Sequence, residues 1–255
     1  MKNDSDNKIV ELFRHANASA KLVEVADSFE MKRGGQLSDL HIAYETWGEL
    51  NKDQSNVIVI FTGLSANSHV TSSQNNQTPG WWETMVGDGK AIDTSKYHVI
   101  CINTLGSCFG STSPVSINKK TSQPYRLTFP ELTVEDMANA SALLLKKIGI
   151  DKIHLLIGPS LGGMKALAFS ILHNTVVDNM ILISTATQAL PFAIALRSLQ
   201  REVIRKDPLW SNGFYSYEKP PLNGVRIARK IGMTSYRSAN EWVQRFGRKK
   251  SVENK

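Results

Sequence analysis

The sequence predicts an α/β fold, a mostly parallel sheet with flanking helices, followed by a purely helical part. Short apolar, β-branched runs alternate with segments of helical period over residues 1–189. One such run leads directly into Gly158–Gly162, which reads Gly-Pro-Ser-Leu-Gly and precedes a helical segment. From about Leu190 the apolar residues recur at helical spacing with no strand pattern between them. We therefore expect a core over residues 1–189 and a helical part over residues 190–255.

The strands expected in the core fall into two groups. Leu22–Glu30 and Asp39–Trp47 alternate in polarity, which predicts an antiparallel pair joined through Lys32–Gln36. Four later runs are continuously apolar, as is typical of strands buried on both faces of a parallel sheet. These runs are Asn56–Phe61, Tyr97–Ile102, Ile153–Ile157 and Asn179–Ser184.

Helices are expected from their period and their end signals. Thr133 and Asp136 form a capping-box pattern with Asp in place of Glu, so a helix should begin there and end near Gly149. In the second part, the period predicts helices over 191–206, 223–234 and 238–247, with a loop at Pro208–Pro221.

Composition limits the class of protein. A chain of 255 residues with 41% hydrophobic and 21% charged residues is ordinary for a globular protein. No apolar stretch reaches the roughly 18–20 residues of a membrane helix, and Met1–Asn7 lacks the apolar segment of a signal peptide. Cys101 and Cys108 make no disulfide framework. We expect a cytoplasmic protein with no membrane partner.

The net charge of +7 raises the question of an anionic partner. Much of the excess lies between Arg197 and Lys255, interleaved with apolar residues at helical spacing. That distribution favours a solvated helical face over a nucleic-acid surface. A more specific alternative is that these basic residues attract an anionic cosubstrate such as coenzyme A. No nucleic-acid partner is expected.

Ser160 is the strongest candidate for a catalytic residue. A G-x-S-x-G sequence between a strand and a helix is the context of a nucleophile elbow, and Gly163 adds a further small residue where the backbones must approach closely. The alternative is a serine that only caps the helix. In an elbow, the backbone N–H of Leu161 is one oxyanion donor, and the loop Phe61–His69 is placed to supply another.

A base for this serine is missing from the expected positions. The acid and the histidine follow the nucleophile in this arrangement, but His173 is the sole histidine after Ser160. It lies thirteen residues on, roughly 20 Å along the same helix. His69 precedes Ser160 and is interpreted as structural. Cys108 has no evident partner and is interpreted as a small buried residue.

Several motifs together resemble one enzyme family. They are Leu40–Gly48, Asn103–Pro114, Gly158–Met164, Gly224–Arg229, Thr234–Ser238 and Arg245–Arg248. In this order, from about residue 20 to about residue 250, they resemble the homoserine O-acetyltransferase family, whose members have the α/β-hydrolase fold with a helical lid.

The resemblance implies an acyltransferase that works through an acyl-serine in a ping-pong mechanism. Ser160 would attack the thioester of acetyl-CoA, or of succinyl-CoA, while the N–H groups of Leu64 and Leu161 hold the oxyanion. The acyl group would pass to the hydroxyl of homoserine, in methionine biosynthesis. Arg229 matches the lid arginine that binds the amino-acid substrate, although it could also be a surface residue. The family implies no bound cofactor or metal, and a homodimer.

Family members continue beyond the lid and there supply the triad aspartate and histidine. The chain ends at Lys255, so the resemblance implies a truncated member with an incomplete lid and without the last strands of the sheet. An exposed sheet edge and poor solubility would follow. Two alternatives stay open: a serine hydrolase of the same fold, and a non-catalytic remnant or interaction protein. Acetyl or succinyl donor, and homoserine or serine acceptor, are also left open.

Overall fold

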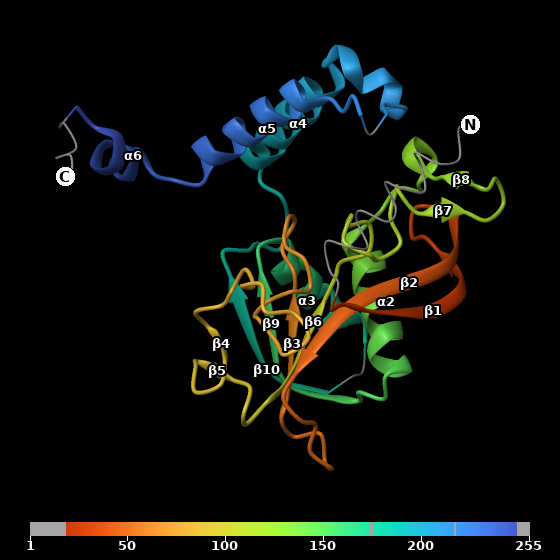
Figure 1. Ribbon diagram of the computed structural model, residues 1–255, viewed down its shortest axis with the longest axis vertical. Coiled ribbons are helices and arrows are strands. Elements are labelled where there is room, and N and C mark those ends of the chain that lie inside the picture. The colour runs from red at the N-terminus through yellow and green to blue at the C-terminus, as the bar shows by residue number, and fades with distance from the viewer. Residues whose placement is uncertain (1–18, 174–175, 217, 249–255) are drawn as a thin grey trace. The chain divides into compact units, whose positions relative to one another are not determined.

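The computed structural model describes residues 19–173, 176–216 and 218–248 (Figure 1). The polar segment Met1–Asn7 and the basic residues Lys249, Lys250 and Lys255 lie outside these ranges. The chain divides into two compact units, with the boundary between Gln188 and Ala189.

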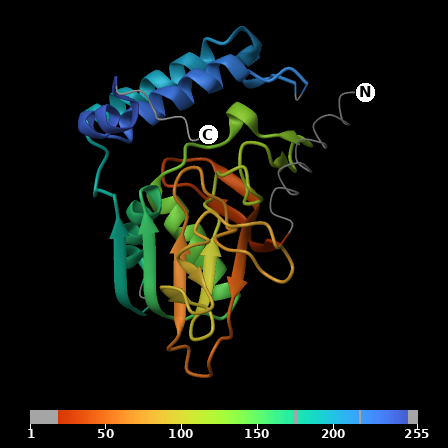
Figure 2. The ribbon, with the colours of Figure 1, turned by 60° about the vertical axis from the view of Figure 1, so that its left-hand side comes forward.

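A six-stranded sheet forms the centre of the first unit, in the order β1-β2-β6-β3-β9-β10 (Figures 1 and 2). β2 pairs antiparallel with β1 on one side and with β6 on the other. β6, β3, β9 and β10 run parallel to one another. The predicted α/β class with a mostly parallel sheet is confirmed. The strands are β1 (Lys21–Glu30), β2 (Gln36–Trp47), β3 (Val57–Phe61), β6 (His98–Ile102), β9 (Lys152–Pro159) and β10 (Val176–Ile183).

Two small sheets lie outside the main one, and the sequence did not predict them. They consist of two-residue strands, which are too short to show any periodicity: β4 (Val86–Gly87), β5 (Ile92–Asp93), β7 (Ile117–Asn118) and β8 (Gln123–Pro124). Two longer strands begin earlier than expected, β2 at Gln36 and β10 at Val176.

The central strand β3 is buried along its whole length, as its apolar run predicts. Val57, Val59 and Phe61 belong to one hydrophobic cluster, and Ile58 and Ile60 belong to another. Because side chains of a strand alternate between the two faces, this division shows that both faces of the sheet are covered at β3.

The edge strand β10 is not buried on both faces, contrary to the expectation from its apolar run. Its apolar side chains Met180, Ile181, Leu182 and Ile183 are between 36% and 46% exposed. β10 pairs with β9 on one side, and within the described ranges no strand pairs with its other side. An apolar run becomes a buried strand only where neighbouring elements cover it, so the run alone did not determine burial.

Two helices pack against one face of the sheet. α2 (Val134–Lys147) begins with the predicted capping box, in which Asp136 N donates to Thr133 Oγ1 at 3.2 Å and Thr133 N donates to Asp136 Oδ2 at 2.9 Å. α3 (Leu161–Leu172) follows β9 directly and buries Ala166 and Phe169 in the same cluster as α2. A 3₁₀ helix, η1 (Arg126–Thr128), precedes α2.

The second unit is helical, with α4 (Pro191–Arg205), α5 (Leu222–Ser235) and α6 (Ala239–Phe246) at the predicted positions. The segment expected as a loop contains a 3₁₀ helix, η2 (Pro208–Gly213). α4 and α5 run side by side (Figure 2), and Gln200 Nε2 donates to Ala228 O at 2.6 Å. None of the described helices is long and apolar enough to cross a membrane.

Candidate active site

Ser160 occupies a strained turn between β9 and α3. Its φ of 53° and ψ of −119° are unusual for a residue with a Cβ, and its side chain is exposed. The side chain makes no capping hydrogen bond, which argues against the simple helix-cap interpretation. The end of β10 holds this turn, because Ser160 N donates to Ile183 O at 2.9 Å and Thr185 Oγ1 donates to Ser160 O at 2.7 Å. The geometry is that of a nucleophile elbow.

Three glycines allow the backbones to meet around this serine. A Cβ on Gly158 would lie 2.4 Å from Gly162 O, and one on Gly163 would lie 2.6 Å from Thr185 Cγ2. A Cβ on Gly162 would lie 2.2 Å from the carbonyl oxygen of Phe61 at the end of β3. The small residues of the motif are therefore required by the contact of helix α3 with the sheet.

We expect Gly162→Ala to lower the free energy of unfolding by about 3 kcal/mol, because the Phe61 backbone cannot move aside as a flexible side chain could. Denaturant unfolding of the purified variant measures this. Gly63→Ala is the matched control, since its Cβ would have Pro159 O at 3.6 Å as its nearest contact, an ordinary distance. A Gly162→Ala variant as stable as Gly63→Ala would contradict the packing argument.

The two candidate oxyanion donors follow adjacent parallel strands, β9 and β3, at the same edge of the sheet. Leu161 is the first residue of α3, and Leu64 follows β3, which pairs with β9. The Gly63 end of the Leu64 loop lies beside the elbow, near Pro159 O. Within the described ranges, neither N–H donates to a protein acceptor. Their oxyanion role stays a prediction.

His69 is buried and both of its ring nitrogens are occupied. Nδ1 donates to Glu45 Oε2 at 2.9 Å, and Nε2 donates to Thr78 O at 2.7 Å. Burial lowers the pKa of His69, but the Glu45 carboxylate and the Thr78 carbonyl outweigh this effect, and the net pKa is raised. No nitrogen is left to accept a proton from Ser160.

This buried pair predicts a pH dependence of stability. Because the folded-state pKa of His69 is raised, the pair contributes stability below the unfolded-state pKa, and the contribution disappears as the pH rises through the folded-state pKa. When the pH is raised from about 6 to about 8, we expect the free energy of unfolding to fall less in His69→Gln than in the parent. His98→Gln is the control, because His98 Nδ1 bonds a backbone carbonyl and not a carboxylate. Equal losses in the parent and His69→Gln would contradict the prediction.

His173 lies at the far end of the elbow helix, where it is the C-cap residue of α3. Its Nε2 pairs with Asn139 Oδ1 at 2.9 Å, and burial lowers its pKa. Neither His69 nor His173 is therefore placed as the base of Ser160.

The cysteines are not poised as nucleophiles. Both are free, Cys101 is fully buried, and burial raises the pKa of each thiol. Cys108 is half-buried, so the expectation of a buried residue is corrected. It lies on a loop that reaches the surface beside a cavity.

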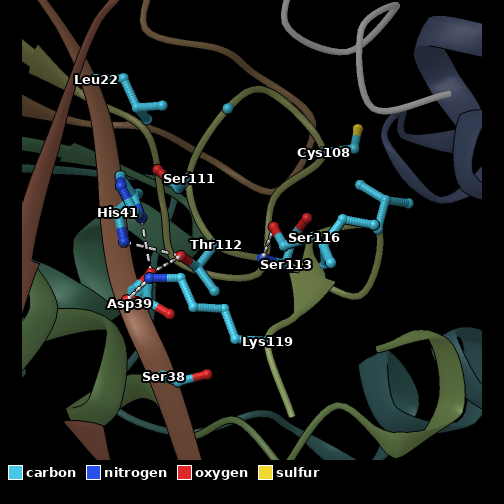
Figure 3. Close-up of a pocket in the computed structure, with 13 residues that line it drawn as sticks. Leu22, Ser38, Asp39, His41, Cys108, Ser111, Thr112, Ser113, Ser116 and Lys119 are labelled. Atoms are coloured by element: carbon cyan, nitrogen blue, oxygen red, sulfur yellow. Dashed lines mark hydrogen bonds and ion pairs between the residues drawn. The ribbon is translucent and has the colours of Figure 1, made fainter. Parts of the chain in front are cut away.

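That cavity, of about 300 Å³, lies between β2 and the segment 108–119, as Figure 3 shows. Asp39 and Lys119, which line the cavity, form an ion pair, and His41 Nδ1 donates to Asp39 O at 2.7 Å. Ser160 does not line it, and β6 and β3 separate β2 from β9. At about 4.8 Å per strand, the cavity belongs to a different region of the sheet edge from the elbow.

Two charged residues on helices also concern the site. Arg229 is exposed on α5 of the second unit, and its carboxylate-binding role stays a prediction. Lys165 on α3 was missed by the sequence reasoning, although it is fully buried one turn beyond the elbow. A lone lysine within the apolar segment Met164–His173 was the signal that could have identified it. No cluster of metal-ligating side chains occurs in the described ranges.

Comparison with known proteins agrees with this geometry. Residues 56–255 match the α/β hydrolase fold family. The chain is 54% identical over 220 residues to a serine O-succinyltransferase of Xanthomonas oryzae, covering 86% of this chain and 55% of that protein. It is 50% identical over 230 residues to an L-serine/homoserine O-acetyltransferase of Streptomyces lavendulae, covering 90% and 62%.

Solved structures point the same way. The homoserine O-acetyltransferase of Bacillus anthracis superposes with a TM-score of 0.81 at 31% identity, covering 92% of this chain and 64% of that one. Esterase E22 superposes with a TM-score of 0.79 at 32% identity, covering 88% and 63%. The chain thus spans between 55% and 64% of the length of these relatives. With its elbow serine, its mostly parallel sheet and these matches, the chain belongs to the α/β-hydrolase-fold family.

Proposed function

We propose that the protein is an O-acyltransferase that moves an acyl group from acyl-CoA to the side-chain hydroxyl of L-serine or L-homoserine. The observation that carries this proposal is the exposed Ser160 in its strained elbow, within a chain 50–54% identical to serine and homoserine O-acyltransferases. Acetyl-CoA and succinyl-CoA are the candidate donors, and methionine biosynthesis is the candidate pathway.

In the first half of the proposed reaction, Ser160 Oγ attacks the thioester carbonyl carbon and gives its proton to a base. The negative charge that develops on the carbonyl oxygen is held by the N–H groups of Leu161 and Leu64, the first of them at the N-terminus of α3. The C–S bond then breaks, coenzyme A leaves as the protonated thiol, and an acyl-serine remains.

In the second half, the hydroxyl of the amino acid attacks the acyl-serine carbonyl carbon and gives its proton to the base. The bond between that carbon and Ser160 Oγ then breaks, Oγ takes the proton back from the base, and the O-acyl amino acid leaves. The Arg229 guanidinium would bind the amino-acid carboxylate, a pairing that its planar donor geometry suits. The basic second unit would also suit the phosphates of coenzyme A. We propose a cytoplasmic homodimer, as the family resemblance implies.

The base itself is the unassigned part of this mechanism. His69 and His173 are both engaged elsewhere, and loss of a triad histidine lowers turnover by up to about 10⁶. We therefore expect slow transfer by the 255-residue chain, and a rate that rises when free imidazole is added as a substitute base.

The test is release of the coenzyme A thiol from acetyl-CoA and succinyl-CoA, with imidazole, in the presence of serine, homoserine or no acceptor. Release that depends on the acceptor and is absent in Ser160→Ala supports the transferase. No release above Ser160→Ala from folded protein would contradict it.

The likeness to esterase E22 favours hydrolysis as a second candidate. In the same assay, a hydrolase would release thiol equally with and without the amino acid, because water is then the acceptor. Arg229→Ala separates the two functions further: it should raise the KM for the amino acid in a transferase and leave a hydrolase unchanged.

A further inference from the structure

Lys165 is a buried lysine with no carboxylate partner among the residues that the structure describes. Its side chain is fully excluded from solvent, and its Nζ lies 4.1 Å from the centroid of the Phe61 ring. Within the described ranges its one hydrogen bond is to Thr104 Oγ1 at 3.3 Å, and no ion pair includes it. Burial of an amine costs free energy unless its donors are used, so the hydrogen bond to Thr104 offsets part of that cost.

The hydrogen bond begins a chain of hydroxyl groups. Thr104 Oγ1 and Thr62 Oγ1 are 3.1 Å apart, and Thr62 Oγ1 donates to Ile102 O at 3.3 Å. Because Thr62 gives its single proton to that carbonyl, Thr104 must donate to Thr62 and accept from Lys165. Both threonines are buried, so the donors run in one direction from Lys165 to the end of β6.

This chain of hydroxyl groups joins three segments that are distant in the sequence. Lys165 is on the helix that begins after Ser160, Thr62 begins the loop that carries Leu64, and Thr104 is the second residue after β6. The first turn of α3 also packs on the same backbone, since a Cβ on Gly162 would lie 2.2 Å from Phe61 O and 3.0 Å from Thr62 O.

We propose that Lys165 is a positioning residue: through Thr104 and Thr62 it holds the loops that follow β6 and β3 against the helix that begins at Ser160. The positioning follows from the geometry alone, and its catalytic consequence rests on the proposed function. By fixing Thr62, Lys165 sets where the Leu64 N–H lies relative to the Leu161 N–H.

An amine suits this task in either protonation state. Burial lowers the pKa of Lys165 to about 7, and Cys101 on β6 supplies no compensating negative charge, because burial keeps its thiol protonated. The ammonium donates and lies over the Phe61 ring, and the neutral amine still donates. Methionine would fill a similar volume without the desolvation cost but could not donate.

Amide hydrogen exchange measured by mass spectrometry tests the positioning without any turnover. In Lys165→Met we expect exchange about tenfold faster than in the parent in the two loops, residues 63–69 and 105–113, with no acceleration in α2 or β3. Thr104→Val should accelerate the same loops, and the double variant should add nothing further, because both changes break one chain.

Two further variants separate positioning from a general effect on stability. Lys146→Met, on the exposed side of α2, should leave both loops unchanged. Lys165→Gln keeps an N–H donor and should restore most of the protection. Unchanged loop exchange in Lys165→Met would overturn the proposal, and so would acceleration spread evenly over the whole protein.

Kinetics then addresses the catalytic consequence. If the parent transfers acyl groups, Lys165→Met should lower kcat about tenfold at unchanged KM for acyl-CoA. If the parent shows no transfer, the proposed function fails while the exchange experiment still decides the role of Lys165. A rise in KM with unchanged kcat would contradict positioning of the oxyanion donors.

Discussion

Replacing Ser160 by alanine should abolish acceptor-dependent release of coenzyme A and leave the fold unchanged. The variant removes the oxygen that attacks the thioester, and losing the nucleophile of such a site costs up to about 10⁶ in turnover. The Ser160 side chain is exposed and makes no capping bond, so the unfolding free energy should change by less than about 0.5 kcal/mol. Thiol release and denaturant unfolding measure the two effects on the same preparations.

Cys108→Ala is the matched control for this experiment. Cys108 is a half-buried thiol on the loop after β6, and burial raises its pKa, so it stays protonated. We expect it to keep the parent's activity. Activity retained in Ser160→Ala and lost in Cys108→Ala would show that the elbow is not the reactive centre.

The second large effect expected is self-association through β10. Its outer backbone groups have no partner strand within the described ranges, and Met180–Ile183 are exposed on both of its faces. The neighbouring end of α3 adds Ile171 and Leu172, at 82% and 48% exposure. An uncovered apolar edge of this kind pairs with another strand. Sedimentation velocity over a concentration series should show assemblies that grow with concentration.

Ile181→Lys should suppress this association, because a charge on an edge strand opposes strand pairing. Leu50→Lys is the matched control, since Leu50 is 42% exposed, close to the 46% of Ile181, but lies in a loop away from the edge. We expect the control to associate like the parent. A parent that stays a monodisperse, cooperatively melting monomer at all concentrations would contradict the prediction.

The elbow could be predicted from the sequence because its physical requirement is local. A strand, a serine in a strained turn and a helix must meet within a few residues, so the small residues appear in the motif itself. The helix cap at Thr133 was predictable for the same reason. Burial of β10 was not, because it depends on what lies beside the strand and not on the strand's own residues.

The rest of the site depends on contacts between distant segments. Lys165 meets Thr104 and Thr62 only after three segments fold together, so no spacing in the sequence indicates the chain of hydroxyl groups. The pairing of His69 with Glu45 is likewise a tertiary contact, across 24 positions. Chain order alone indicated that His69 is not the base, and the structure supplies the physical reason.

The most direct measurement of the central claim is mass spectrometry of the Ser160 peptide after the protein is mixed with acyl-CoA and imidazole, before and after an amino-acid acceptor is added. We predict an acyl group on Ser160 that disappears when serine or homoserine is added, together with formation of the O-acyl amino acid. Product that forms without acylation of Ser160, or an acyl group carried by another residue, would contradict the assignment of Ser160 as the nucleophile.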